Sequence, residues 1–396
     1  MSVRLISHPA LTASRRVAAI KYQLSPSSPL LQHLRRPDPI ITRRGPAGII
    51  SSSRRDFTRA AAAMAPVPNT MKAVLISKTG GTDVLDYETN VPVPTPIDGN
   101  VLIKNDLIGI NYIDTYFRTG LYKAPQFPYI LGREAEGTIV ALNPEGDSYG
   151  LKVGDRVAYM GENVYAEYTT APAARVVKVP ENFKRGTAAG ALLQGLTALT
   201  LVREAHAVKK GDWVLVHAAA GGTGLLLCQL LRAIGANTIG TVSTPAKAEL
   251  AQKAGATHVV NYSHEDVKAR VAELTGGQGC AAVFDGVGAS TFDVSLDCVA
   301  RKGSMVSFGN ASGAVPPFTI SRLSAKNARL LRPTLFNYLA TRDEFIGYAE
   351  QLFDFITMSA LDISVHEIYP LSEIRRAHED LEGRKTSGKL LLDPSK

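Results

Sequence analysis

Short apolar runs bounded by glycine, proline or polar residues recur between about residue 210 and residue 332, and amphipathic segments separate them. Runs of four to eight apolar residues are typical of strands that are covered on both faces of a parallel sheet. Their alternation with helical segments predicts a doubly wound α/β domain of six strands, the Rossmann arrangement. We expect strands at 213–217, 237–242, 257–261, 281–285, 304–308 and 328–332, and helices at 223–234, 245–254, 264–274 and 290–301.

The first of these strands runs into a turn rich in small residues, HAAAGGTG. Ala219, Gly221 and Gly224 have the spacing of a G-x-G-x-x-G turn with alanine in the first place, and Gly235 stands where the following helix should end. Small residues are needed because the backbone must turn sharply and let a pyrophosphate reach the N–H groups of the helix N-terminus. The string alone fits an ordinary strand-to-helix turn equally well, but the six-strand pattern favours a dinucleotide site.

The end of the second strand indicates which dinucleotide binds. An NAD-binding domain usually has Asp or Glu there, whereas this chain has TVSTPAKAE. An acid would repel a 2′-phosphate, but Ser243, Lys247 and Tyr262 can donate hydrogen bonds to it. NADPH is therefore favoured over NADH, although a solvated lysine in the first turn of a helix is the alternative. After the fifth strand, the loop SFGNASG (Ser307 to Gly313) has the composition of a segment beside the nicotinamide.

The part of the chain that precedes this domain is rich in strand and turn signals. The runs MKAVLI, VPVPTP and NVLIKNDLIGI predict a compact β-rich unit from Met71 onwards. Polar and phenolic side chains then cluster within twelve residues. Amphipathic packing is the favoured explanation of any single residue in this cluster. Its members are Asn111, Tyr112, Asp114, Tyr116 and Tyr122.

The three cysteines argue against zinc chemistry. A zinc alcohol dehydrogenase needs a thiolate near Asn111, a histidine near Arg133 and a four-cysteine lobe, yet no cysteine precedes Cys228. Cys228, Cys280 and Cys298 have no metal-ligand or disulfide spacing, so we expect buried free thiols and no metal site. No apolar run reaches the length of about eighteen residues that a membrane span needs.

The net charge of +8 belongs to the N-terminal leader. Residues 1–70 contain eleven Lys and Arg and two Asp and Glu, whereas the remaining residues have a net charge of −1. The leader is rich in Arg and Ser and poor in acids, which is typical of a mitochondrial targeting segment, and we attach no fold to it. The alternatives are an unused extension and a cytosolic form that starts at Met64 or Met71. The near-zero net charge of residues 71–396 removes the main support for nucleic-acid binding.

Eight motifs occur in order from Met71 to about Pro394: GINYIDTYFRTGLY, GREAEG, HAAAGGTG, STPAKAELA, VFDGVG, SFGNASG, LLRPTL and SGKLLL. Together they resemble the quinone oxidoreductases of the zeta-crystallin type, which are zinc-free members of the medium-chain dehydrogenase/reductase superfamily, and they are most similar to the fungal branch. The resemblance implies a GroES-like β-barrel catalytic domain made of residues 71–195 and 333–396. It places the Rossmann domain, residues 196–332, between these parts and the active site in the cleft. It also implies NADPH, a quinone or enone acceptor and a homodimer.

The same resemblance implies a set of cofactor contacts, and the chain departs from the family at three places. Thr223 replaces the usual valine, Gly286 stands where serine is common, and the pair Glu134 and Glu136 is unusual beside a cleft unless it caps a turn. The implied contacts, besides Gly221 and Gly224, are Tyr112, Asp114, Tyr116, Thr200, Gly222, Thr223, Ser243, Lys247, Tyr262, Val287, Phe308, Gly309, Asn310, Ala311, Pro333, Thr334, Leu335 and Arg384.

Without a metal, hydrogen-bond donors must meet the negative charge that develops on an acceptor oxygen. Tyr122 is the candidate donor, because a phenol is protonated at neutral pH. Asn111 is the candidate for orienting the acceptor or the nicotinamide. We expect a hydride, or electrons and a proton in steps, to pass from NADPH to a carbonyl acceptor in the cleft.

Three classes of function are compatible with the chain. NADPH-dependent quinone reduction is the leading hypothesis. An alkenal, enone or enoyl-thioester reductase on the same scaffold is the second; the leader favours it, but no basic groove for a phosphopantetheine arm is evident. An RNA-binding or structural, crystallin-like role is the third, and the near-zero charge after residue 70 argues against it.

Overall fold

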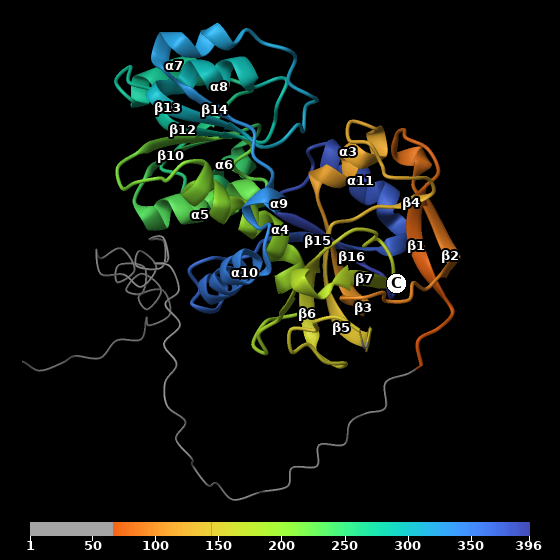
Figure 1. The fold of residues 1–396 in the computed structure, drawn as a ribbon. Coiled ribbons are helices and arrows are strands. Elements are labelled where there is room, and N and C mark those ends of the chain that lie inside the picture. The colour runs from red at the N-terminus through yellow and green to blue at the C-terminus, as the bar shows by residue number, and fades with distance from the viewer. Residues whose placement is uncertain (1–65, 144) are drawn as a thin grey trace, which may run out of the picture.

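The computed structural model describes residues 66–143 and 145–396. The hypothesis of a targeting leader falls on residues that lie almost wholly outside these ranges, as does the alternative start at Met64. The described chain forms two large β-sheets and a small third one, with helices around and between the large sheets (Figure 1). No helix in these ranges is both long and apolar enough to cross a membrane.

The prediction of a doubly wound parallel sheet is confirmed. All five strand pairings in this sheet are parallel, and the order places the first strand in the middle. In spatial order the strands are β11 (His258–Asn261), β10 (Asn237–Val242), β9 (Trp213–Val216), β12 (Cys280–Asp285), β13 (Val299–Ser307) and β14 (Arg329–Leu331).

Alternate residues of β9 face opposite helical layers. Val214 and Val216 pack with apolar residues of α5 (Gly222–Ile234), whereas Leu215 packs with residues of α7 (Val267–Leu274) and α8 (Phe292–Cys298). Both faces are therefore buried, which is why this strand has no polar alternation. Helix α5 ends at Gly235, whose φ of 83° is the left-handed conformation predicted for that position.

The prediction of a helix at 290–301 was wrong at its C-terminal end. Helix α8 stops at Cys298, and β13 begins at Val299, which pairs with Cys280 at the start of β12. An irregularity follows in which Lys302 has a φ of 66°. The short apolar run at this point fits the period of a helix and that of a strand equally well, and its pairing with β12 makes it a strand. Helix α7 also starts later than predicted, at Val267, after its N-cap Asp266.

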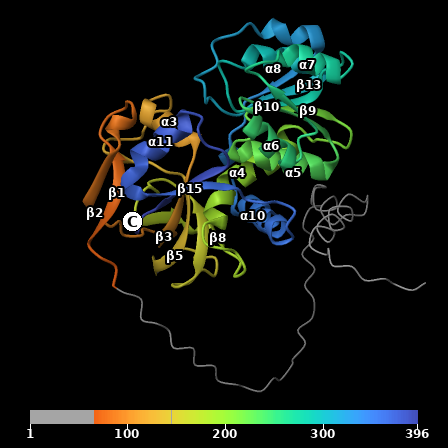
Figure 2. The same ribbon diagram turned by 180° about the vertical axis from the view of Figure 1, so that it is seen from behind.

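The second sheet combines both ends of the described chain. Figures 1 and 2 both place the C-terminal β15 and α11 beside N-terminal elements. Its last strand in sequence, β16, lies inside the sheet, between β15 and β3. In spatial order its strands are β15 (Val365–Pro370), β16 (Lys389–Asp393), β3 (Asn100–Ile110), β5 (Glu134–Leu142), β6 (Arg156–Met160) and β8 (Val176–Lys178); β7 (Tyr168–Pro172) also pairs with β3, and β2 (Asp86–Pro92), β1 (Thr70–Ile76) and β4 (Tyr129–Ile130) form a small third sheet.

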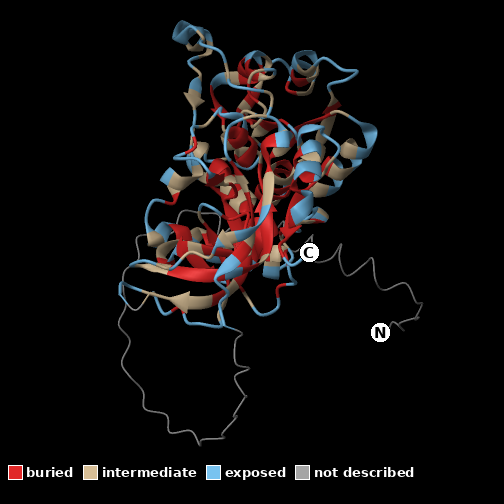
Figure 3. Ribbon diagram, turned by 90° about the vertical axis from the view of Figure 1, so that its right-hand side faces the viewer, coloured by how far each residue is buried: buried red, intermediate tan, exposed pale blue. Residues whose placement is uncertain are grey.

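Helix α4 (Thr187–Thr200) connects the two halves and crosses the predicted domain boundary at residue 195. Its apolar residues join one core cluster that includes Val177 from β8 and Val216 from β9. Buried residues accordingly run through the strands and inner helices of both halves (Figure 3). The remaining helical elements are η1 (Thr82–Val84), α3 (Tyr112–Thr119), η2 (Ala173–Arg175), η3 (Leu201–Ala205), α6 (Pro245–Ala254), η4 (Ile320–Lys326), α9 (Leu335–Tyr338), α10 (Arg342–Thr357), η5 (Leu371–Glu373) and α11 (Ile374–Glu382).

Candidate active site

A cleft of about 450 Å³ lies between the two halves, at the carboxyl ends of the parallel strands. Ligands of open α/β sheets bind at this edge, and the volume suits a small molecule. The cleft is therefore the candidate active site. Most of the predicted site residues line it: Asn111, Tyr112, Tyr116, Tyr122, Thr200, Gly221, Gly222, Thr223, Gly224, Val287, Phe308, Gly309, Ala311, Pro333, Thr334, Leu335 and Arg384.

The turn after β9 has the close backbone packing that its small residues predict. A Cβ added at Gly224 would lie 2.3 Å from the carbonyl oxygen of Ala218, so only glycine lets α5 start against the strand. A Cβ added at Gly222 would lie 2.0 Å from the side chain of Gln194. The first intrahelical bond is donated by Leu225, so the N–H groups of Gly222, Thr223 and Gly224 have no partner within the helix, and these three residues line the cleft. A helix N-terminus of this kind fits a pyrophosphate.

Two cations meet beyond the end of β10, where the 2′-phosphate is predicted. The Lys247 ammonium donates to the carbonyl oxygen of Arg384 at 2.6 Å. Burial and the nearby Arg384 guanidinium lower the pKa of Lys247. Thr244 caps helix α6, which puts Lys247 in its first turn. Like charges held this close favour an anion beside them. Ser243 directly follows β10, and Tyr262 is 42% exposed; neither they nor Lys247 line the cleft itself.

Two phenols of helix α3 hold the cleft wall, one within its own half and one across to the parallel sheet. The Tyr112 hydroxyl donates to the carbonyl oxygen of Leu381 at 3.1 Å. The Tyr116 oxygen accepts the backbone N–H of Asn310, in the loop after β13, at 2.7 Å. Burial raises the pKa of Tyr112, and it raises the pKa of Tyr116 to about 12. Both phenols are therefore protonated at neutral pH and act as anchors of the cleft wall.

Tyr122 has a partner that the sequence did not reveal. The Arg332 guanidinium, directly after β14, donates through Nη2 to the Tyr122 oxygen at 3.1 Å. Nη1 of the same group donates to the carbonyl oxygens of Ser307 at 2.7 Å and Gly309 at 3.3 Å. Arg332 stands at the carboxyl end of the sixth predicted strand, and this position is the signal by which it could have been found.

Asn111 lines the cleft, but its amide is engaged in the wall. Its nitrogen donates to Glu134 at 2.8 Å, and its oxygen accepts from the Lys389 ammonium at 2.8 Å. Lys389 and Glu134 form an ion pair at 2.5 Å and are 1% and 0% exposed. The second oxygen of Glu134 accepts the backbone N–H of Leu193 in α4. These contacts give Asn111 a part in holding the wall together; its predicted role in orienting a ligand stays a prediction.

Glu136, the other member of the acid pair, caps helix α4. Its carboxylate accepts the backbone N–H groups of Gly186, Ala188 and Ala189 at 2.7 to 3.1 Å. A carboxylate at this position also complements the helix dipole. Glu136 therefore caps a helix rather than a turn, and Glu134, which pairs with Lys389, is not a cap.

Asp114 lies beneath the cleft and has no exposed surface. Its carboxylate accepts the backbone N–H of Asn111 at 2.8 Å and the Tyr165 hydroxyl at 2.7 Å. Burial raises its pKa to about 6 despite these hydrogen bonds. The Tyr165 hydroxyl also lies 3.3 Å from Nε2 of His378. Asp114 therefore fixes the start of α3 from inside the protein, without lining the cleft.

His217 is a second cleft residue that sequence reasoning missed. Its Nδ1 lies 3.0 Å from the Thr241 hydroxyl and its Nε2 lies 2.9 Å from the Ser295 hydroxyl, which in turn donates to Asp285 at 2.7 Å. Burial lowers the pKa of His217 and so favours the neutral ring. The network joins the ends of β9, β10 and β12 under the cleft. The departure at Gly286 has a steric reason, because a Cβ there would lie 2.8 Å from the Phe308 ring.

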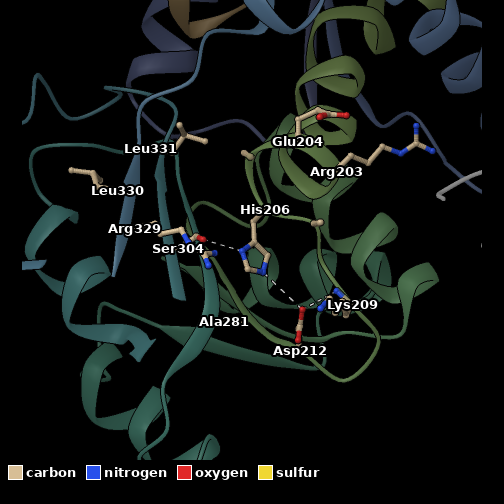
Figure 4. A pocket seen from close by; sticks show the side chains of 12 residues that line it. Arg203, Glu204, His206, Lys209, Asp212, Ala281, Ser304, Arg329, Leu330 and Leu331 are labelled. Carbon is tan, nitrogen blue, oxygen red and sulfur yellow. Dashed lines mark hydrogen bonds and ion pairs between the residues drawn. The ribbon is translucent and has the colours of Figure 1, made fainter. Parts of the chain in front are cut away.

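A second cavity, of about 640 Å³, lies at the opposite, amino-terminal edge of the parallel sheet (Figure 4). His206 stands at its centre, with Nδ1 3.0 Å from the Ser304 hydroxyl and Nε2 3.9 Å from Asp212. The 3.9 Å separation is too long for a hydrogen bond, and Ser304 is only 3% exposed, so the three do not form a hydrolytic triad. Burial lowers the pKa of His206. The active-site assignment therefore stays with the cleft.

The described residues contain no group of three or more His, Cys, Asp or Glu side chains placed to hold a metal. Cys228, Cys280 and Cys298 are buried free thiols. Burial raises the pKa of each to about 12, which favours the thiol over the reactive thiolate at neutral pH.

Comparison with known proteins agrees with this geometry. The family model described as "Alcohol dehydrogenase GroES-like domain" matches residues 97–181, which confirms the predicted GroES-like unit, and "Zinc-binding dehydrogenase" matches residues 222–354. A probable quinone oxidoreductase of Schizosaccharomyces pombe is 48% identical over 81% of this chain and 96% of its own length. A 2-haloacrylate reductase of a Burkholderia species is 37% identical over 81% and 98%. The solved structure of Escherichia coli quinone oxidoreductase complexed with NADPH is 40% identical, with a TM-score of 0.79, over 82% of this chain and all of that one.

Proposed function

We propose, since the chain belongs to the quinone oxidoreductase family of the medium-chain dehydrogenase/reductase superfamily, that it is an NADPH-dependent quinone reductase that binds its acceptor in the cleft. The observation that carries the choice of cofactor is the pair of cations, Lys247 and Arg384, beside the glycine turn. No Asp or Glu occurs from Asn237 to Ala248, so nothing at the end of β10 would repel a 2′-phosphate.

The residues of the cleft have separable tasks in this reaction. The N–H groups at the start of α5 bind the pyrophosphate, and Lys247 with Arg384 binds the 2′-phosphate. When bound, NADPH supplies the reducing electrons. Tyr116 and the loop that it holds at Asn310 line the nicotinamide end and restrict water. Tyr122 donates a hydrogen bond to the acceptor oxygen.

Titration calorimetry of the full chain with NADPH, with NADH as the control ligand, tests the assignment. We expect NADPH to bind at least tenfold more tightly. Lys247→Met should weaken NADPH binding by about 10- to 100-fold, because a hydrogen bond to a charged group contributes about 1.5–3 kcal/mol. Binding of NADH should be unchanged. Lys253→Met, an exposed lysine on the same helix, is the matched control. Equal affinities for the two cofactors would refute the proposal.

Reduction of activated alkenes is the second candidate, and the relative that is a 2-haloacrylate reductase is the observation that favours it. The same cleft and donor would serve, because an enone also develops negative charge on its carbonyl oxygen. NADPH oxidation measured against a panel of ortho-quinones, para-quinones, enones and a 2-enoyl thioester ranks the two. A kcat/KM for an alkene above that of every quinone would replace quinone reduction by this second function.

We further propose a homodimer. The outer edge of β14 has no strand partner among the described residues, and Ile320, just before it in the chain, is 76% exposed. An unpaired edge with apolar surface nearby is a ready surface for a second copy. Light scattering coupled to gel filtration should show twice the chain mass of 42.4 kDa, and a mass of one chain would refute the dimer.

We also propose import into mitochondria, on the charge and composition of residues 1–70. A fluorescent protein fused after residue 70 should localise to mitochondria. The same fusion with the arginine pairs of the leader changed to glutamine should stay in the cytosol, and an even distribution of the unchanged fusion would refute import.

A further inference from the structure

Arg332 is held in the cleft by neutral acceptors alone. Its Nη1 bonds to the carbonyl oxygens of Ser307 and Gly309, and its Nη2 bonds to the Tyr122 hydroxyl. Among the described residues it forms no ion pair, so its positive charge is not compensated by a carboxylate. The two backbone contacts fix the plane of the guanidinium and leave one edge of it directed at the phenol.

Tyr122 is equally restrained. Its ring packs edge-on against Tyr116, with ring centroids 5.2 Å apart, and against Phe117, at 5.7 Å. Because its oxygen accepts the bond from Arg332, the phenol proton is available for another acceptor. Tyr122 lines the cleft, so the acceptor that the proton can reach is a molecule bound there.

We propose that Arg332 is the positioning residue for Tyr122: it holds the phenol oxygen and stabilises the negative charge that forms on it when Tyr122 gives its proton to the reduced acceptor. This inference rests on the proposed function, since it assigns the proton donor of that same reaction. It goes beyond it by making Tyr122 a general acid and by assigning the group that makes the acid effective.

The proton step is balanced within the site. A quinone that has gained a hydride from NADPH, which is two electrons and one proton, carries a single negative charge on one oxygen. The O–H bond of Tyr122 breaks, a new O–H bond forms at that oxygen, and the electron pair stays on the phenol oxygen. That oxygen lies 3.1 Å from Nη2 of Arg332, so the charge is formed beside a cation. Solvent then returns a proton to Tyr122, because Arg332 and the edge of the cleft at Tyr122 are open to water.

The test compares four variants of the full chain at saturating NADPH with an ortho-quinone: Arg332→Gln, Arg332→Lys, Tyr122→Phe and the double variant Arg332→Gln/Tyr122→Phe. Arg332→Gln should lower kcat about tenfold or more, since general acid catalysis is typically worth about 10²–10⁴. The Kd for NADPH, measured by calorimetry, should stay within about twofold. Arg332→Lys should recover part of kcat, because it keeps the charge. Arg301→Gln, an exposed arginine in β13, is the matched control and should leave kcat unchanged.

Two readouts separate a proton-transfer role from a structural one. The solvent isotope effect on kcat should rise in Arg332→Gln, because proton transfer becomes slower relative to the other steps. The double variant should be no slower than Tyr122→Phe, because Arg332 acts through the phenol. If Arg332→Gln does not fold, the same comparison is made with Arg332→Lys and its double variant with Tyr122→Phe.

The possible failures are distinguishable. If the unchanged protein oxidises NADPH with quinones but Arg332→Gln does so at the same kcat, the role of Arg332 is refuted and the proposed function stands. Losses in the double variant that multiply would likewise refute an action through Tyr122. If the unchanged protein does not oxidise NADPH with any acceptor, the proposed function falls first and the role of Arg332 falls with it.

Discussion

Lys389→Met should destabilise the protein strongly, because it removes one half of a buried ion pair. The Lys389 ammonium lies 2.5 Å from the Glu134 carboxylate, and the two side chains are 1% and 0% exposed. Lys389 also donates to the Asn111 amide oxygen at 2.8 Å. Methionine has nearly the same length and shape, so the substitution removes the charge with little change in packing. Glu134 is then left as a buried charge without a cation.

The expected loss follows from the contacts that remain. Removing one partner of a buried pair costs about 3–5 kcal/mol. The Glu134 carboxylate keeps its hydrogen bonds from the backbone N–H of Leu193, at 2.6 Å, and from Asn111, at 2.8 Å. These two bonds still stabilise the charge, so we expect the low end, about 3 kcal/mol. Glu134→Gln added to Lys389→Met removes the unpaired charge and should restore about half of the loss or more.

The free energy of unfolding by urea, followed by far-ultraviolet circular dichroism, measures both effects. Lys123→Met, an exposed lysine after α3, is the matched control and should change stability by less than about 0.5 kcal/mol. A loss of under about 1 kcal/mol for Lys389→Met would be the value of a solvent-exposed pair and would refute the reasoning. A double variant less stable than Lys389→Met would refute it too.

Gly347→Ala, at an exposed site within α10, should raise the free energy of unfolding by about 0.5–1 kcal/mol, because the added Cβ meets no atom within 4 Å; a loss in the same urea titration would contradict this. Gly224→Ala should abolish NADPH binding and lower stability, since its Cβ would lie 2.3 Å from the Ala218 oxygen; a soluble variant with normal affinity in calorimetry would argue against it. His378→Gln should make the protein more tolerant of acid. Burial and the Arg118 charge lower the pKa of His378 from 6.5 to about 3, so the stability present above pH 6.5 is lost as pH falls toward 3. Melting temperatures at pH 7 and pH 4 check this, and an equal drop for both proteins would count against it.

The parallel sheet was predictable because most of its strands are short apolar runs, which is the pattern of a strand buried on both faces. The observed bounds of β10 and α6 are the predicted ones, 237–242 and 245–254. The predicted helix at 290–301 failed at Val299 for the opposite reason. A run of a few apolar residues fits both the helical and the strand period, and only the pairing of Val299 with Cys280 decides between them. That pairing joins two segments whose contact no local pattern encodes.

The same distinction, between local patterns and contacts distant in sequence, applies to the residues of the candidate site. The glycine turn and Lys247 could be proposed from the sequence because the chemistry of phosphate binding demands particular residues at close spacing in the chain. Contacts across long stretches of sequence were not: Arg332 meets Tyr122 at a separation of 210 residues, and Lys389 meets Asn111 at 278. The part of Asn111 in the wall was therefore missed, because Lys389, one of its two side-chain partners there, comes from the far end of the chain.

Because β16 lies between β15 and β3, the second sheet can form fully only when the C-terminal strand has been synthesised. The strands of the parallel sheet have all left the ribosome once residue 331 has emerged, so that half can fold while translation continues. The outer edge of β3, by contrast, waits for Leu390–Leu392, the residues that pair with it. Nascent chains that stall before this point leave the apolar outer edge of β3 unpaired, and an edge of this kind favours aggregation.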